Sequence, residues 1–266
     1  MADEGGVAAV DRALSILDAL TDDKVSLADL SKRTDLYKST VLRLLKSLEK
    51  FGYVLRTVDG SYRLGSKVLH LGALYQRHFR TSEIVPPVLE RIGAELHEGA
   101  SFYVCEEDKR VCLHRVETTR AVRDSIQVGD RLPLTVGAAG HVLRAFNGAR
   151  GERFDEIRQR MFAASFGERD SETAAVAAPV LGPGNKLIGA LSVSGPRYRI
   201  EAAGEARIVP VLFKHAKELT RTFGGNVDDP TLMGWNLARG GKARRSKAAA
   251  TMKSGARSAA AVDDAS

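Results

Sequence analysis

Apolar residues recur with a helical period through the first fifty positions. Between residues 10 and 20 they predict an amphipathic helix. Its inward-facing positions are expected to be Val10, Ala13, Leu14 and Leu17. A second, short helix should begin at Ser26, which can form an S-x-x-D capping box with Asp29. Thr34-Asp35 then marks a tight turn, because Asp tolerates the left-handed backbone that turns use.

The next helix is predicted over residues 37–50. Val41, Leu44, Leu45 and Leu48 fall at i, i+3, i+4 and i+7 and form one apolar stripe. The opposite side is polar and basic, and the start of the helix offers small polar groups and backbone N–H donors to phosphates and bases. The residues of this helix expected to face DNA are Lys38, Ser39, Thr40, Arg43 and Lys46.

Asp59-Gly60 predicts a two-residue hairpin turn between short strands. A helix, a turn, a basic helix and a hairpin in this order describe a winged helix-turn-helix. That module places one helix in the major groove of double-stranded DNA and its wing beside the phosphates. The wing residues expected on or near the DNA are Arg56, Tyr62 and Arg63.

Residues 66–80 predict a further helix with a broad apolar surface. Val68, Leu71 and Tyr75 lie on one side, and Leu69 and Leu74 widen it. Such a surface between two domains needs a partner, and DNA readers commonly pair to match two half-sites. We therefore expect a homodimer or homotetramer and a pseudo-palindromic operator.

From residue 81 to 224 helices and strands alternate. The strands are expected at 100–105, 110–116, 121–128, 173–181 and 187–194, and the helices at 84–98, 137–146 and 201–223. Hairpins flanked by helices predict an α+β domain with an antiparallel sheet.

The distribution of charge distinguishes the two ends of the chain from its middle. The net charge of +7 is concentrated at the two ends, and residues 242–257 contain basic but no acidic side chains. Residues 1–9 and a basic tail over 225–266 are therefore expected to be disordered. No signal segment and no apolar run of membrane-spanning length is present, so we expect a cytoplasmic protein without membrane contact.

Motifs of common enzymes are absent from the sequence. It contains no G-x-x-x-x-G-K-[ST], H-E-x-x-H or G-x-S-x-G pattern. Cys112 and His114 alternate on one predicted strand, where a metal site is conceivable, but nothing orients them. Cys105 and Cys112 are better interpreted as reduced packing residues. We expect no enzyme and no cofactor.

Two short motifs could line a ligand cavity. Small residues in G-A-A-G (137–140) let a carboxylate approach backbone N–H groups at a helix start, but they equally suit close packing of a helix on a sheet. Ser192 and Ser194 point to the same side of a strand, where they would meet either a polar ligand or solvent.

Several motifs in one order resemble the IclR family of bacterial transcriptional regulators. They include V-D-R-A-L-S-I-L-D-A-L, S-L-A-D-L-S-K-R-T, K-S-T-V-L-R-L-L-K-S-L-E-K-F-G-Y-V, Y-R-L-G, V-G-D-R-L-P-L-T-V-G-A-A-G, V-A-A-P-V and S-V-S-G-P. The resemblance implies a winged helix-turn-helix over 10–65, a linker helix over 66–80 and a GAF-like effector-binding domain over 81–224. It also implies control of DNA affinity by a small organic acid.

The resemblance places the effector between the G-A-A-G segment and the S-V-S-G-P strand. The implied effector-binding residues are Ala138, Ala139, Ser165, Ala175, Ser192 and Ser194. Small side chains at 165 and 175 favour a roomier, less polar pocket and hence a larger acid. His141 and the pair Glu172-Thr173 depart from the family pattern near this pocket, which leaves the identity of the effector open.

Two functions of different class follow. The first is a ligand-responsive transcriptional regulator. The alternative is a GAF-like small-molecule-binding protein or enzyme whose winged helix makes protein contacts. Only the first requires salt-dependent binding to a specific DNA.

Overall fold

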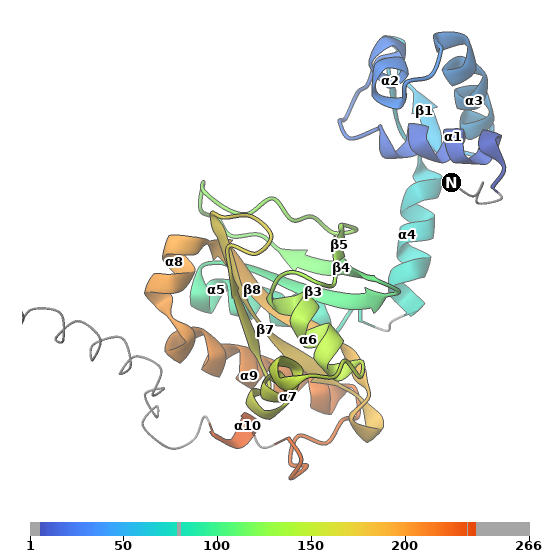
Figure 1. Ribbon diagram of the computed structural model, residues 1–266. Coiled ribbons are helices and arrows are strands. Elements are labelled where there is room, and N and C mark those ends of the chain that lie inside the picture. The colour runs from blue at the N-terminus through green and yellow to red at the C-terminus, as the bar shows by residue number, and fades with distance from the viewer. Residues whose placement is uncertain (1–5, 79–80, 233, 238–266) are drawn as a thin grey trace, which may run out of the picture. The chain divides into compact units, whose positions relative to one another are not determined.

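The computed structural model describes residues 6–78, 81–232 and 234–237, in two compact units that meet in sequence at residues 85 and 86. The first unit is a helical module with a small hairpin (Figure 1). Its elements are α1 (Ala8–Asp18), α2 (Leu27–Thr34), α3 (Lys38–Lys50), β1 (Val54–Arg56), β2 (Tyr62–Leu64) and α4 (Ser66–His78).

The core of the first unit lies where α1, α2 and α3 meet the hairpin. Ile16, Leu30, Val41 and Leu45 are fully buried there. The predicted inward face of α1 is wrong in part, because Val10 and Leu14 are 52% and 53% exposed. The stripe through Ala13 and Leu17 continues instead to Ile16 and Leu20, which are buried and which the prediction did not include.

The second unit contains a six-stranded antiparallel sheet in the order β5-β4-β3-β8-β7-β6. Its strands are β3 (Gly99–Glu106), β4 (Lys109–Val116), β5 (Arg131–Pro133), β6 (Ala163–Phe166), β7 (Thr173–Leu181) and β8 (Leu187–Pro196). Its helices are α5 (Val85–Leu96), α6 (Ala138–Phe146), α7 (Glu152–Arg160), η1 (Pro183–Asn185), α8 (Arg197–Ala203), α9 (Glu205–Thr222) and α10 (Gly234–Leu237). The predicted α+β class with an antiparallel sheet is confirmed.

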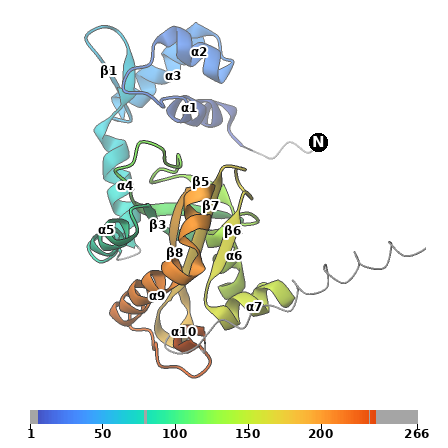
Figure 2. The ribbon, with the colours of Figure 1, turned by 90° about the vertical axis from the view of Figure 1, so that its left-hand side faces the viewer.

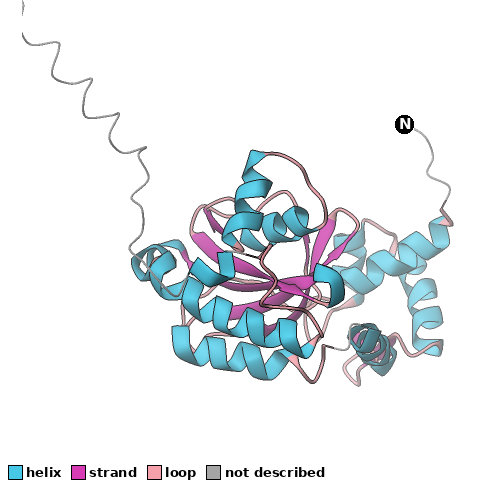
Figure 3. Cartoon of the chain, turned by 90° about the horizontal axis from the view of Figure 1, so that it is seen from below, coloured by secondary structure: helices cyan, strands magenta, loops and turns pink. Residues whose placement is uncertain are grey.

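Helices cover both faces of this sheet (Figures 2 and 3). On one face α6 packs against β7 and β8 and buries Val142 and Leu143 beside Ala177 and Ala190. On the other face α9 packs against the same two strands, and Arg91 of α5 pairs with Glu218 of α9. Neighbouring residues of β8 therefore face different layers.

Residues 117–130 form an irregular segment, which we call the strap, and not the strand predicted over 121–128. Val122 and Val128 are 61% and 52% exposed, so their β-branched side chains did not indicate a sheet position. Tertiary contacts fix the strap instead. The Asp130 carbonyl accepts from the Cys112 N–H, and Asp124 forms an ion pair with Arg115.

The chain just beyond residue 224 is ordered, although the sequence predicted disorder from residue 225. Trp235 of α10 is fully buried, and the Lys217 ammonium donates to its carbonyl oxygen at 2.5 Å. Asn185 also donates to Asp229 at 2.6 Å. Disorder starting at 225 is therefore wrong for residues 225–232 and 234–237, and disorder over 1–9 is wrong for residues 8 and 9, which belong to α1. Residues 238–266 of the predicted tail and residues 1–5 of the predicted disordered start lie outside the described residues. No helix in the described parts of the chain is long and apolar enough to cross a bilayer.

Candidate functional site

The turn between α2 and α3 has the geometry that the sequence predicts. Ser26 caps α2 by accepting from the Asp29 N–H at 3.1 Å, and its hydroxyl donates to the Asp29 carboxylate at 2.6 Å. Asp35 adopts the left-handed conformation at φ 53°. The Ser31 hydroxyl then donates to the Leu36 carbonyl at 2.6 Å, which holds the turn closed. This fixes the angle at which α3 leaves the core.

One face of α3 is open to solvent along its length. Val41 and Leu45 anchor the helix in the core, whereas Lys38, Ser39, Arg43 and Lys46 are exposed and Thr40 is half-buried. None of the basic side chains Lys38, Arg43 and Lys46 forms an ion pair within the described residues. Tyr37, which the sequence reasoning did not single out, stands 86% exposed just before the helix. The surface can therefore meet phosphates and base edges.

The hairpin β1–β2 places Arg56 and Arg63 in solvent. Tyr62 is different. Its ring is only 2% exposed, in the core of the module, and Arg56 lies over it at 5.9 Å from the ring centre. The prediction that Tyr62 faces DNA is wrong, because alternation along β2 turns this residue inward. Strand β1 ends at Arg56 and β2 begins at Tyr62, so the connection is longer than the two-residue turn predicted at Asp59-Gly60.

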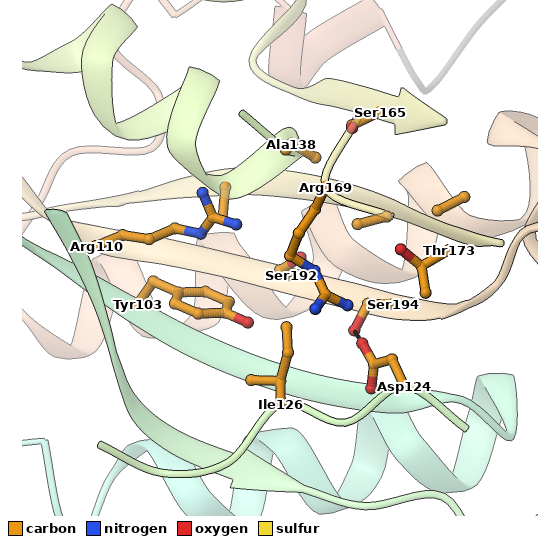
Figure 4. A pocket seen from close by; sticks show the side chains of 14 residues that line it. Tyr103, Arg110, Asp124, Ile126, Ala138, Ser165, Arg169, Thr173, Ser192 and Ser194 are labelled. Carbon is orange, nitrogen blue, oxygen red and sulfur yellow. Dashed lines mark hydrogen bonds between the residues drawn. The ribbon is translucent and has the colours of Figure 1, made fainter. Parts of the chain in front are cut away.

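A cavity opens in the second unit between the start of α6 and the strands β6, β7 and β8 (Figure 4). Strand pairing brings its parts together, because Ala175 is opposite both Ser165 and Ser194. All six residues that the resemblance implied line this one cavity, namely Ala138, Ala139, Ser165, Ala175, Ser192 and Ser194. About 30 Å³ of it is open to the centre of a water molecule, so in this conformation it is narrow.

Both serine hydroxyls already have acceptors within the protein. Ser192 donates to the Val176 carbonyl at 3.3 Å, and Ser194 donates to the Asp124 carboxylate at 2.6 Å. Each hydroxyl oxygen keeps lone pairs for a ligand donor. A ligand that lacks a donor would not satisfy these oxygens.

Charged side chains at the cavity were missed by the sequence reasoning. Arg110 is 4% exposed, and its guanidinium donates to the carbonyls of Pro133 and Val136 and stacks over Tyr103 at 5.6 Å. Its Nε is buried without a partner in the described structure. Burial above all, and also the neighbouring Arg169, lowers the pKa of Arg110. Arg110 and Cys112 are two residues apart on β4, so alternation along the strand places both side chains on the face that Tyr103 of β3 shares. This alternation was the sequence signal that could have placed Arg110 at the cavity.

Arg169 lies on the turn between β6 and β7 and reaches over the cavity (Figure 4). Among the residues that the structure describes, it has neither an ion-pair nor a hydrogen-bond partner. The only acidic residue lining the cavity within the described chain is Asp124. Arg115 neutralises it in an ion pair whose side chains are 2% and 1% exposed. The cavity therefore carries net positive charge from Arg110 and Arg169, which the expectation of a less polar pocket did not include.

Glu168, the neighbour of Arg169, ties that turn to the start of α6. It accepts from the Gly137 N–H at 2.8 Å and from His141 Nε2 at 2.5 Å, and Arg153 pairs with it at 3.1 Å. Partial burial alone would raise the pKa of Glu168, but these donors bring it below its ordinary value. These contacts fix the turn from which the Arg169 side chain extends over the cavity.

The G-A-A-G segment packs closely and lines the cavity. A Cβ on Gly140 would lie 2.5 Å from the Leu134 carbonyl oxygen and 2.9 Å from Arg110, and Gly137 has φ 82°. Ala138 and Ala139, between them, line the cavity. Close packing therefore explains Gly140, whereas Gly137 lines the cavity as the two alanines do, and the approach of a carboxylate to this segment stays a prediction.

Cys112 and His114 do not form a reactive pair. Burial raises the pKa of the Cys112 thiol to about 12, so it stays protonated. Both cysteines are free, and no group of three or more metal-ligating side chains occurs in the described parts of the chain.

The chain matches two models of known families. Residues 9–57 match the IclR helix-turn-helix domain, and residues 74–153 and 151–221 match the bacterial transcriptional regulator IclR C-terminal domain. Similar proteins include the regulator BhcR of Paracoccus denitrificans, 26% identical over 82% of this chain and 88% of its own. The Pca regulon regulatory protein of Pseudomonas putida is 27% identical over 80% and 83%.

Solved structures share the fold. The IclR protein of Thermotoga maritima aligns with a TM-score of 0.67 at 22% identity, over 81% of this chain and 98% of its own. An IclR homolog of Microbacterium hydrocarbonoxydans complexed with 4-hydroxybenzoate aligns with a TM-score of 0.63 at 20% identity, over 81% and 99%. The two family models, which together match more than half of the chain, show that it belongs to the IclR family of bacterial transcriptional regulators.

Proposed function

We propose that a small organic acid binds in the cavity between α6 and β8 and changes the affinity of the protein for its operator. The observation that supports this most strongly is that Arg110 and Arg169 line the cavity and neither forms an ion pair within the described residues. A guanidinium group recognises a carboxylate through two parallel hydrogen bonds. A carboxylate between the two would also relieve their mutual repulsion.

The lining of the cavity also offers acceptors for a hydrogen-bonding group. These are oxygens of Asp124 and Ser194, so an acid that also carries a hydroxyl would find both a positive partner and an acceptor. The relative crystallised with 4-hydroxybenzoate is consistent with this class. Because the cavity is narrow, the half-exposed Arg169 would have to move outward for an aromatic acid to enter.

The DNA-reading surface consists of the exposed face of α3, with Arg56 and Arg63 on the hairpin. A second copy of the chain would pair through α4, where Leu69 is 77% exposed and Leu71 and Leu74 are 40% and 44% exposed. Two such modules would read a pseudo-palindromic operator. An acid changes the affinity for DNA only as far as it binds one arrangement of the domains better than another.

The effector site is tested by Arg169→Gln. This change removes a positive charge at the cavity without leaving a buried partner unpaired. A charge-assisted hydrogen bond contributes about 1.5–3 kcal/mol, so we expect the variant to bind 4-hydroxybenzoate or benzoate at least about 10-fold more weakly in calorimetry. Arg150→Gln is the matched control, because Arg150 is exposed and does not line the cavity. If both variants lost affinity for the acid equally, the assignment of the site to this cavity would be wrong.

A further inference from the structure

A second cavity lies on the other face of β8, between that strand, α8 and α9. These elements are labelled in Figure 1. Val193 of β8 forms part of its wall and lies between Ser192 and Ser194, which face the first cavity. Since successive side chains of a strand point to opposite faces, the sheet separates the two cavities. The second one is the larger, with about 250 Å³ open to the centre of a water molecule.

The inner wall of the second cavity is apolar. Leu96 at the end of α5, Val193, Ile200 of α8 and Ile208 of α9 line it, and all are buried. This wall would favour the hydrocarbon part of a ligand and offers it no hydrogen-bonding partner.

The rim of this cavity is basic. Arg199 is satisfied by the protein, because it donates to both oxygens of Glu98 at 2.5 and 2.8 Å in a largely buried pair. Arg120 of the strap and Arg207 of α9 are exposed, and within the described residues the guanidinium group of neither has an ion-pair or hydrogen-bond partner. The acidic residue of the lining, Glu98, is thus already neutralised, and two cations remain free at the mouth.

We infer that this second cavity binds a monocarboxylate with an apolar aryl or alkyl body, at a site distinct from the first cavity. The hydrocarbon part lies on the buried wall, and the carboxylate is held at the mouth by Arg120 and Arg207. A neutral ligand of the same shape gains only the apolar contact, and an inorganic anion gains only the charge. Both groups together define the class of ligand.

The strap connects the two cavities in sequence. Arg199 donates to the Val122 carbonyl at 2.9 Å, and Asp124 and Ile126 of the same segment line the first cavity. An experiment must therefore record the two cavities separately. The methyl groups of Ile200 and Ile208 report on the second cavity, and the methyl group of Ile126 reports on the first.

The test uses the full chain with labelled isoleucine methyl groups, titrated with benzoate and followed by NMR. We expect saturable shifts of Ile200 and Ile208, and a weaker response to benzamide. In Arg120→Gln combined with Arg207→Gln the apparent affinity at these methyls should fall about 10-fold or more, with the Ile126 response kept. Arg150→Gln controls for the loss of a surface charge.

Arg169→Gln separates this proposal from the effector assignment. That variant should lose the Ile126 response and keep the shifts of Ile200 and Ile208. The second site is overturned if those two methyls do not respond saturably, if benzamide shifts them as strongly, or if the double variant binds benzoate like the parent. A failure confined to Ile126 would count against the first cavity only.

Discussion

Arg110 shows how a single residue can set the character of a binding site. Its guanidinium is buried, bonded to the backbone of Pro133 and Val136, and supported by the ring of Tyr103. A buried charge is costly unless something compensates it, and here the carbonyl dipoles, the π face of Tyr103 and the more distant charge of Glu168 do so in part, while Nε has no hydrogen-bond partner in the described structure. The guanidinium of Arg110 is therefore held in one position at the cavity, whereas the side chain of Arg169 is free to change its conformation.

Gly140 determines how closely α6 approaches Arg110 and the backbone at Leu134. A Cβ at this position would meet the Leu134 carbonyl oxygen at 2.5 Å and the Arg110 guanidinium at 2.9 Å. Gly140→Ala should therefore destabilise the fold by about 1–3 kcal/mol through overpacking, as measured by urea unfolding. Gly93→Ala in α5 is the control, since its Cβ would make ordinary contacts of 3.6 Å and should be neutral or slightly stabilising. Equal stability of the two variants would contradict the close packing of α6.

His141 should make the stability of the protein sensitive to acid. Burial lowers the pKa of His141 below 6.5, although Glu168 acts in the opposite direction. As the pH falls below 6.5, the unfolded chain binds a proton at this position before the folded chain does, so the free energy of unfolding decreases. Above that pH the contribution is fully present.

His141→Asn should remove this part of the acid sensitivity, measured by urea unfolding at several pH values between about 7.5 and 5. His70→Asn is the control because His70 is exposed. If His141→Asn and the parent lose stability in parallel over this range, His141 does not hold the neutral form.

At the level of elements, periodicity located most helices and strands. The predicted strand 173–181 coincides with β7, and the helix predicted over 37–50 begins one residue late at Lys38. The strap was misread, because Val122, Ile126 and Val128 have strand propensity but their segment is fixed by ion pairs and backbone contacts from distant residues. Such contacts leave no periodic trace in a sequence.

The candidate site, like the secondary structure, was predicted only in part. Small and hydroxylated residues at the cavity came from the family resemblance, and the structure brings them together. Arg110, Arg169 and Asp124 could not be placed, because their positions depend on strand register, on the Glu168 turn and on the strap. The prediction that Tyr62 faces DNA was wrong for a different reason. Its place in the hairpin was predicted correctly, but its side chain points into the core.

The exposed face of α3 leads to a prediction for DNA binding. Arg43→Ala should weaken binding to a selected DNA site by about 1–3 kcal/mol if the guanidinium contacts a base, because that side chain is exposed and unpaired in the described structure. Fluorescence anisotropy on DNA selected from a random pool measures this. Arg12→Ala on α1 is the control, and an unchanged affinity of Arg43→Ala relative to that control would rule out the contact.

For the whole molecule, α4 leads to a prediction about assembly. Leu69 and Leu74 are exposed apolar residues on this helix. Changing both to Glu should raise the dissociation constant of the dimer about 10-fold or more in analytical ultracentrifugation, since charges would have to be buried in the contact. Val58→Glu, at a fully exposed apolar position on the hairpin, should leave assembly unchanged. A parent chain that is monomeric at micromolar concentration would refute the role of α4.

The most direct measurement is the affinity of the full chain for a selected DNA site, determined by anisotropy as benzoate, 4-hydroxybenzoate and their neutral amides are added. We expect salt-dependent, sequence-specific binding, a change in DNA affinity with an acid but not with its amide, and loss of that change in Arg169→Gln with DNA binding retained. DNA binding without sequence preference, or an acid response that Arg169→Gln and Arg150→Gln share with the parent, would contradict the account.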